Sequence, residues 1–428
     1  MGTTVYLHIG TPKTGSTSIQ HTFFRNRATL LASGINYLPL GRNHAGSLMP
    51  LLSENPHKHS RNLRKGIDTP QKAQSRNKAI SQRLTRELSR NGSAKLVISG
   101  EAFSAASFDE VRRLKDLLDP YAERYRIIVY VRDPYEYANS AALQRIKGGA
   151  VIGNSVGDVP LPRYRQLQNY IEIFGRTHID IRIFDSKRFV GGDLIADFLH
   201  ALGESPDLTK GMEIIRTNRS LSHEAAMIMS EINAGVPVHI NGYGNPLRAT
   251  NIRFLMEAIE GVRYSCDPQC YLKRENKILT ELQWLHKQIG ERVFLRPVPA
   301  PASVPRWGEA TVRSILDLVR SMALKLHQLE HDQPANRIHT TLPAELEWLR
   351  EAADPRQAIP SPSRLKIAPH FDQATVRSLA RLIHDMAFGL EKAEVPTRKT
   401  PVRENWQSRL FLFVRRRAAG MLSGSKST

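Results

Sequence analysis

Cysteine is scarce in this chain, whose 428 residues include two, Cys266 and Cys270. They lie four positions apart, and no second pair of metal-ligating residues matches them, so the spacing argues against a structural zinc site with four ligands. Two cysteines in a chain of this length form no disulfide framework, which favours a reducing compartment.

Long apolar runs are missing as well. No stretch approaches the roughly 20 apolar residues that a membrane-spanning helix needs. The chain also does not begin with a basic segment followed by an apolar one, so no signal peptide is expected. These absences predict a cytoplasmic protein.

Acidic residues are few beside basic ones: 41 Asp and Glu against 61 Lys and Arg give a formal net charge of +20. Most of the excess comes from two stretches. Residues 57–95 hold eleven basic and two acidic residues, and residues 395–428 hold eight and one. A basic surface of this kind attracts acidic glycans, nucleic acid or an anionic membrane. We expect no specific nucleic-acid partner.

A loop near the start of the chain has the composition of an anion-binding site. A short apolar run ending at Ile9 reads as a buried strand, and hydroxyl residues from Ser16 onward open a helix. The loop between them contains Gly10, Gly15 and the cation Lys13. Unpaired N–H groups of a first helical turn, together with the helix dipole, favour negative charge there. An ordinary strand-to-helix turn with a surface lysine is the alternative.

This loop is not a Walker A motif. That motif places its lysine directly after the second glycine, whereas here Ser16 follows Gly15 and Lys13 precedes it. No aspartate after an apolar strand completes a magnesium site of the NTPase type. The loop is therefore predicted to hold phosphates without a metal ion.

A second stretch, residues 127–140, repeats the pattern of an apolar strand followed by a helix. The strand ends in Arg132-Asp133-Pro134, where Asp133 can cap the helix and Pro134 suits its first turn. Arg132 stands at the carboxyl end of the strand, where open α/β sheets bind ligands. Ser140 follows eight residues later, about two helical turns away. Both side chains could reach one phosphate.

The two stretches together resemble the sulfotransferases that use 3′-phosphoadenosine 5′-phosphosulfate (PAPS), and most of all their bacterial carbohydrate-type branch. Three further stretches share the resemblance, namely residues 34–37, 99–101 and 218–222, and it extends over residues 4–235. It implies PAPS as the sulfuryl donor and a P-loop-like fold. The residues that it assigns to the donor are Pro12, Lys13, Thr14, Gly15, Ser16, Thr17 and Ser18 at the 5′-phosphosulfate, and Arg132 and Ser140 at the 3′-phosphate.

Catalytic roles are predicted for three residues. Lys13, by its position and by the resemblance, would stabilise the charge on the leaving group. Glu101 directly follows a predicted strand and is the first candidate for the general base, although it could instead cap a helix or pair with an arginine. His44, in a loop, is the second candidate base.

The remaining pattern predicts an α/β fold with three layers and a mainly parallel sheet, followed by a helical module. Strands are expected at 4–9, 35–38, 95–98, 126–131 and 179–184, a helix at 17–31, and only helices and loops after Ser222. The predicted domains are residues 1–235 for PAPS binding, a helical region at 236–395, and a basic amphipathic tail at 396–428.

An internal repeat marks the helical region. Residues 281–285 match 345–349, and residues 310–314 match 374–378, both at an offset of 64. Duplicated helical units stack to share an apolar face, so residues 275–395 are read as a module for packing, partner docking or formation of a homo-oligomer. The tail, with its apolar patch and arginines, suggests peripheral contact with an anionic membrane.

The leading hypothesis is therefore a PAPS-dependent sulfotransferase acting on a hydroxyl of a glycan, a glycolipid or one of their precursors. One alternative is a P-loop phosphotransferase for small molecules, which should require magnesium. Another is a non-catalytic protein on the same fold that binds a polyanion or a membrane.

Overall fold

The computed structural model describes residues 3–90, 94–152, 161–216, 220–240, 243–294, 308–332, 346, 349 and 373–393. The chain divides into two compact units. The first unit comprises Met1–Tyr137, Leu161–Asn218 and Arg274–Arg296, and the second comprises Ala138–Pro160, Arg219–Lys273 and Pro297–Thr428. The units interleave along the chain, whereas the predicted domains are consecutive segments.

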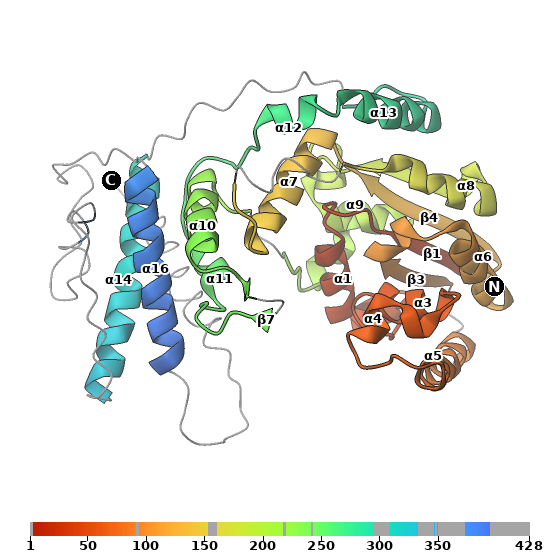
Figure 1. Ribbon diagram of the computed structural model, residues 1–428. Helices are drawn as coiled ribbons and strands as arrows, with labels where there is room; N and C mark the ends of the chain where they lie inside the picture. The colour runs from red at the N-terminus through yellow and green to blue at the C-terminus, as the bar shows by residue number, and fades with distance from the viewer. Residues whose placement is uncertain are drawn as a thin grey trace. The chain divides into compact units, whose positions relative to one another are not determined.

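Five parallel strands form the sheet of the first unit, which confirms the predicted α/β class (Figure 1). Their order across the sheet is β2-β3-β1-β4-β5. Most of their residues are buried, as expected where helices cover both faces of a parallel sheet. The strands are β1 (Thr4–Ile9), β2 (Ile35–Tyr37), β3 (Lys95–Gly100), β4 (Arg124–Val131) and β5 (Ile179–Ile183).

The strand order places a ligand-binding edge between β1 and β4. From β1 the chain continues to β2 on one side, and from β4 it continues to β5 on the other side. Ligands bind beyond the carboxyl ends of parallel strands where successive connections diverge in this way. The loops after Ile9 and after Val131, which carry the two predicted phosphate motifs, both begin at this point.

Helices cover the two faces of the sheet. On one face, Ile19 and Phe23 of α1 and Phe198 of α9 pack with Tyr130 of β4 in a fully buried cluster. Helices α3, α6 and α8 form a second group, in which α6 contacts both α3 and α8. The helices of this unit, with 3₁₀ helices marked η, are α1 (Ser16–Arg25), α2 (Arg27–Ala32), α3 (Ala45–Leu52), η1 (Pro56–Lys58), α4 (Ser60–Leu63), α5 (Pro70–Arg90), η2 (Glu101–Ala105), α6 (Phe108–Leu118), η3 (Asp119–Tyr121), η5 (Tyr164–Leu167), α8 (Gln168–Phe174), η6 (Arg176–His178), η7 (Val190–Gly192), α9 (Leu194–Ala201), η8 (Pro206–Gly211) and α13 (Glu275–Ile289).

The single helix predicted over residues 17–31 is wrong, because Asn26 divides it into α1 and α2. The Asn26 side chain donates to the carbonyls of Thr22 and Glu213, at 2.7 and 2.9 Å, and accepts from the Glu213 N–H at 2.9 Å. These bonds attach a segment almost two hundred residues further along the chain, which local periodicity does not reveal.

The second unit is mainly helical. Its elements are α10 (His223–Gly235), β6 (His239–Ile240), β7 (Tyr243–Gly244), α11 (Ile252–Met256), α12 (Pro268–Leu272), α14 (Glu309–Asp332) and α16 (Gln373–Ala393), and α7 (Pro134–Lys147) continues into it. The expectation of helices and loops alone after Ser222 is wrong, because β6 and β7 pair as an antiparallel hairpin. The dipeptide Asn241-Gly242 between them is a strong hairpin signal in the sequence.

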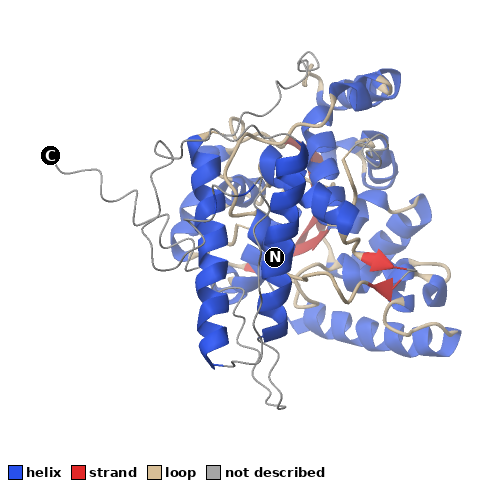
Figure 2. Cartoon of the chain, turned by 60° about the vertical axis from the view of Figure 1, so that its left-hand side comes forward, coloured by secondary structure: helices blue, strands red, loops and turns tan. Residues whose placement is uncertain are grey.

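The repeat is visible in α14 and α16, which lie side by side in both views (Figures 1 and 2). Their buried positions recur at the 64-residue offset: Val312 with Val376, Ile315 with Leu379, Met322 with Met386, and Leu326 with Leu390. The two helices thus bury the same apolar face. Helix α13, from the shorter part of the first copy, belongs to the first unit, and most of its counterpart at 345–349 lies outside the described residues, as does the predicted tail.

Within the described part of the chain, none of the helices has both the length and the apolar character that crossing a bilayer requires.

Candidate active site

The loop between β1 and α1 has a tightly fixed backbone. Lys13 and Gly15 both have positive φ angles, 69° and 73°. The Thr14 hydroxyl donates to the Thr11 carbonyl at 2.7 Å, and the Thr11 hydroxyl donates to the carbonyl of Tyr130 in β4. Lys13 is a non-glycine residue in a left-handed conformation, which costs free energy and persists only where the surroundings enforce it. The loop is therefore held to β4 in one shape.

Gly10 is needed for this close approach. A β-carbon at Gly10 would overlap the Ser16 hydroxyl and would lie 3.2 Å from the Cα of Glu101. The β1 and β3 strands end in register, with Ile9 opposite Gly100, and the Gly10 N–H donates to the Gly100 carbonyl at 3.1 Å. Glu101 therefore begins directly beside the loop.

The start of α1 has no side-chain cap. Its N-cap is Gly15, and its first turn holds no acidic residue. Ser16 is 5% exposed, and its hydroxyl has no hydrogen-bond partner among the described residues. A buried polar group without a partner costs free energy, so this helix start fits an oxyanion such as a phosphate.

The other predicted donor residues differ in exposure. Pro12, Lys13, Thr17 and Ser18 are partly exposed. Thr14 is fully buried, and its hydroxyl is turned to the loop itself. Its backbone, rather than its side chain, is the part that remains for a ligand.

Arg132 links the second motif to the first. Its Nη1 donates to the Lys13 carbonyl at 2.8 Å, its Nη2 lies 3.4 Å from Glu136, and its guanidinium stacks over the Phe184 ring at 5.3 Å. Asp133 caps α7 as predicted, since its Oδ1 accepts the N–H groups of Tyr135 and Glu136, each at 3.0 Å. Ser140 lies further along α7 in the second unit, so its grouping with Arg132 stays a prediction.

Glu101 experiences opposing electrostatic effects. Burial raises the pKa of its carboxyl, while the positive charges of Lys13 and Arg61 lower it, and the net shift is upward. The Glu101 carboxylate in turn helps to raise the pKa of Tyr137, which burial raises most, while Arg163 lowers it. A carboxylate with a raised pKa beside a cationic loop is typical of a general base.

His44 is fully buried, whereas the sequence predicted a loop residue that could act as a base. Its Nδ1 accepts the N–H of Ser99 at 2.9 Å. Burial lowers its pKa to about 4. His8, whose pKa burial lowers to about 3, also contacts Ser99, with 2.8 Å between His8 Nδ1 and the hydroxyl. This arrangement favours a role for His44 in holding β3 rather than in taking a proton from a substrate.

The sequence did not single out Arg61, Tyr137 or Arg163. In the structure, Arg61 lowers the pKa of Glu101, while Glu101 and Arg163 have opposite effects on the pKa of Tyr137. Arg61 belongs to the basic stretch at 57–95, and that stretch offers no signal that distinguishes it from its neighbours. Among the described residues, no cluster of His, Cys, Asp and Glu could hold a metal ion.

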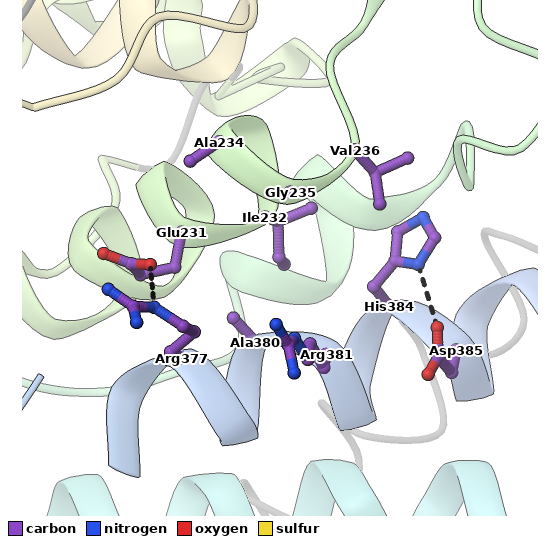
Figure 3. Close-up of a pocket in the computed structure, with 10 residues that line it drawn as sticks. All are labelled: Glu231, Ile232, Ala234, Gly235, Val236, Arg377, Ala380, Arg381, His384 and Asp385. Carbon is purple, nitrogen blue, oxygen red and sulfur yellow. Dashed lines mark hydrogen bonds and ion pairs between the residues drawn. The ribbon is translucent and has the colours of Figure 1, made fainter. Parts of the chain in front are cut away.

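A cavity of about 400 Å³ lies in the second unit, between α10 and α16 (Figure 3). Arg377 pairs there with Glu231 at 3.3 Å, and His384 Nδ1 lies 3.3 Å from Asp385 Oδ1. None of the predicted site residues lines it.

Comparison with known proteins gives limited similarity. No protein-family model matches the chain. An uncharacterized protein of Archaeoglobus fulgidus is 29% identical over 140 residues, which are 32% of this chain and 38% of that protein. A sulfotransferase from Alicyclobacillus acidocaldarius, of known crystal structure, aligns with 67% of this chain and 95% of its own, at 13% identity and a TM-score of 0.37. Neither likeness identifies a family, so function is inferred from the site residues.

Proposed function

We propose that this protein transfers a sulfuryl group from PAPS to a hydroxyl of a glycan, a glycolipid or one of their precursors. The observation that carries the proposal is the 2.8 Å hydrogen bond from Arg132 to the Lys13 carbonyl. It joins the two motifs that resemble the 5′- and 3′-phosphate sites of PAPS-dependent sulfotransferases. A nucleotide with phosphates at its 5′ and 3′ positions carries negative charge where these two motifs place Lys13 and Arg132.

The residues around the loop fit the donor. The first N–H groups of α1 and the unpartnered Ser16 hydroxyl would hold the 5′-phosphosulfate. The Arg132 guanidinium, a planar fork of N–H donors, would bind the 3′-phosphate together with Ser140, as the resemblance assigns them. This second contact would select a 3′-phosphorylated nucleotide over ATP.

The reaction requires one cation and one base. The acceptor oxygen attacks sulfur, and the bond between sulfur and the oxygen of the 5′-phosphate breaks. Lys13 would stabilise the negative charge that develops on that oxygen. Glu101 would accept the proton of the hydroxyl, giving a sulfate ester and 3′,5′-diphosphoadenosine.

A binding experiment tests the donor assignment. Purified protein is titrated calorimetrically with 3′,5′-diphosphoadenosine, and with ATP in the presence and absence of magnesium. We expect the diphosphate to bind without metal, and Arg132→Ala to weaken it by about 10- to 100-fold, as for loss of a charge-assisted hydrogen bond.

Arg126→Ala is the matched control, because Arg126 is exposed at the other end of the same strand. Its affinity for the diphosphate should equal that of the wild type. Preference for magnesium-ATP would replace this proposal with the phosphotransferase. Binding of neither nucleotide would favour a non-catalytic protein.

A further inference from the structure

A continuous line of contacts leads from the loop between β1 and α1 (residues 10–15), the proposed donor loop, to the start of α3. Glu101 follows Gly100, and a β-carbon built on Gly100 would lie 2.6 Å from the β-carbon of Ala45. Ala45 is the first residue of α3, and Gly46 is the second. The first turn of α3, which contains Gly46, therefore packs against the residue that directly precedes Glu101.

Two arginines meet at Gly46. Arg61, from α4, has its Nη1 3.4 Å from the position of a β-carbon at Gly46. Arg76, from α5, donates from Nη2 to the Gly46 carbonyl at 3.3 Å. Helices α3, α4 and α5 lie together in Figure 1, and α3 contacts both of the others. Residues far apart in sequence thus place two guanidinium groups beside one glycine.

These two positive charges lack a compensating carboxylate. Within the described residues neither arginine forms an ion pair, and the buried Arg76 Nη1 has no hydrogen-bond partner. Burial lowers the pKa of Arg76. The neighbouring acid, Glu110, uses its carboxylate to accept the Ser107 N–H at 2.9 Å in the cap of α6. Two like charges held close together and partly buried are unfavourable unless an anion joins them.

The positive potential of this pair extends to its surroundings. Burial lowers the pKa of His59, and Arg61 and Arg76 lower it further against the opposing effect of Glu110. Arg61 also lowers the pKa of Glu101. Arg61, and with it one side of the pair, is therefore within electrostatic range of the candidate base.

We propose that Arg61 and Arg76 form a subsite for an oxyanion of the acceptor, so that the acceptor is an acidic sugar or sugar phosphate rather than a neutral one. This inference rests on the proposed function. A carboxylate or phosphate matches the planar fork of guanidinium donors, and two arginines can bind it on two sides. Held there, the acceptor would present a neighbouring hydroxyl to Glu101.

Binding with the donor site filled tests the subsite. The protein is saturated with 3′,5′-diphosphoadenosine and titrated, at low ionic strength, with glucuronate, glucose 6-phosphate and glucose, using ligand-observed NMR. We expect both acidic sugars to bind and glucose to bind at least tenfold more weakly. A preference for one acid over the other distinguishes a carboxylate from a phosphate as the natural group.

Variants locate the binding. Arg61→Gln and Arg76→Gln should each weaken the acidic sugars about tenfold or more, with unchanged affinity for 3′,5′-diphosphoadenosine as evidence of folding. Arg86→Gln, at an exposed position of the same helix α5, is the control and should bind as the wild type does. If Arg76→Gln does not fold, Arg61→Gln alone decides the outcome.

The two proposals fail in different ways. If the protein bound the diphosphate and also bound glucose as tightly as the acidic sugars, that result would overturn the subsite and leave the proposed donor site intact. Acidic sugars that bind Arg61→Gln as tightly as the wild type would also overturn it. Failure to bind the diphosphate would instead overturn the proposed function.

Discussion

The donor loop and the arginine pair at Gly46 both bring positive charge to the same part of the first unit, but they are built differently. The loop uses consecutive residues, and its donors are mostly backbone N–H groups in a fixed conformation. The pair uses side chains from two helices that converge on a third. A site built from backbone leaves a pattern of glycines and hydroxyls in the sequence. A site built from converging side chains leaves none.

The difference also bears on specificity. Backbone donors at a helix start bind any suitably placed phosphate, and they suit a donor molecule whose phosphates vary little. Arginine side chains bind according to the position of a particular anion. We therefore expect the loop to determine the nucleotide and the pair to determine the acceptor.

The largest expected effect comes from Glu101, whose pKa both Lys13 of the loop and Arg61 of the pair lower. With labelled PAPS and the acceptor that gives the highest wild-type rate, Glu101→Gln should lower kcat by roughly 10²- to 10⁴-fold, because the proton acceptor is lost. Glu54→Gln, at an exposed position of the same unit, should retain the wild-type rate.

The pH profile sharpens this test. A base must be deprotonated, so the wild-type rate should rise with pH through the pKa of Glu101, which burial places above the usual value for a glutamate. Glu101→Gln should lose this acid limb. If the variant kept both the limb and the rate, Glu101 would not be the base.

Two glycine substitutions compare the regions directly. Gly10→Ala places a β-carbon onto the Ser16 hydroxyl and against Glu101, so it should weaken 3′,5′-diphosphoadenosine by about tenfold or more. Gly46→Ala places its β-carbon 3.4 Å from Arg61 Nη1, an ordinary contact, and should leave the diphosphate unaffected while weakening glucuronate at most a few-fold.

Calorimetry on both variants checks this prediction, with Gly211→Ala as the control because no atom lies near its β-carbon position. Equal losses of the diphosphate in both variants would show that the two regions do not act separately.

The smallest expected effect concerns His44, which precedes α3 and accepts the Ser99 N–H of β3. Its folded-state pKa of about 4 lies below the ordinary 6.5, so the unfolded chain binds the proton first. Stability from this group is complete above pH 6.5 and is lost as the pH falls to about 4. The free energy of unfolding should drop by at most ~1.4 kcal/mol per pH unit for this residue.

Urea unfolding between pH 7 and 4 measures this loss. His44→Asn, which retains an acceptor but does not protonate in this range, should reduce the pH dependence, whereas His200→Asn, exposed on α9, should not. If the free energy of unfolding of His44→Asn depended on pH as steeply as that of the wild type, the buried imidazole would not resist protonation.

Several features were predictable from the sequence because each depends on a short local pattern. The five parallel strands appear as apolar runs, the α1 loop as glycines around Lys13, and the α7 cap as Asp133 before Pro134. The similar burial of α14 and α16 follows from the repeat. In each case neighbouring residues carry the information, since helix starts and buried strands are defined within a few residues.

Only the tertiary structure decided the rest. It divided the predicted helix at Asn26, buried His44 beside Ser99 of β3, placed Arg132 on the Lys13 carbonyl, and brought Arg61 and Arg76 to Gly46. Each of these depends on residues distant in sequence. The sequence determined the elements and the donor motif, whereas the surroundings of Glu101 depended on how the helices pack, because side-chain charge acts through space and not along the chain.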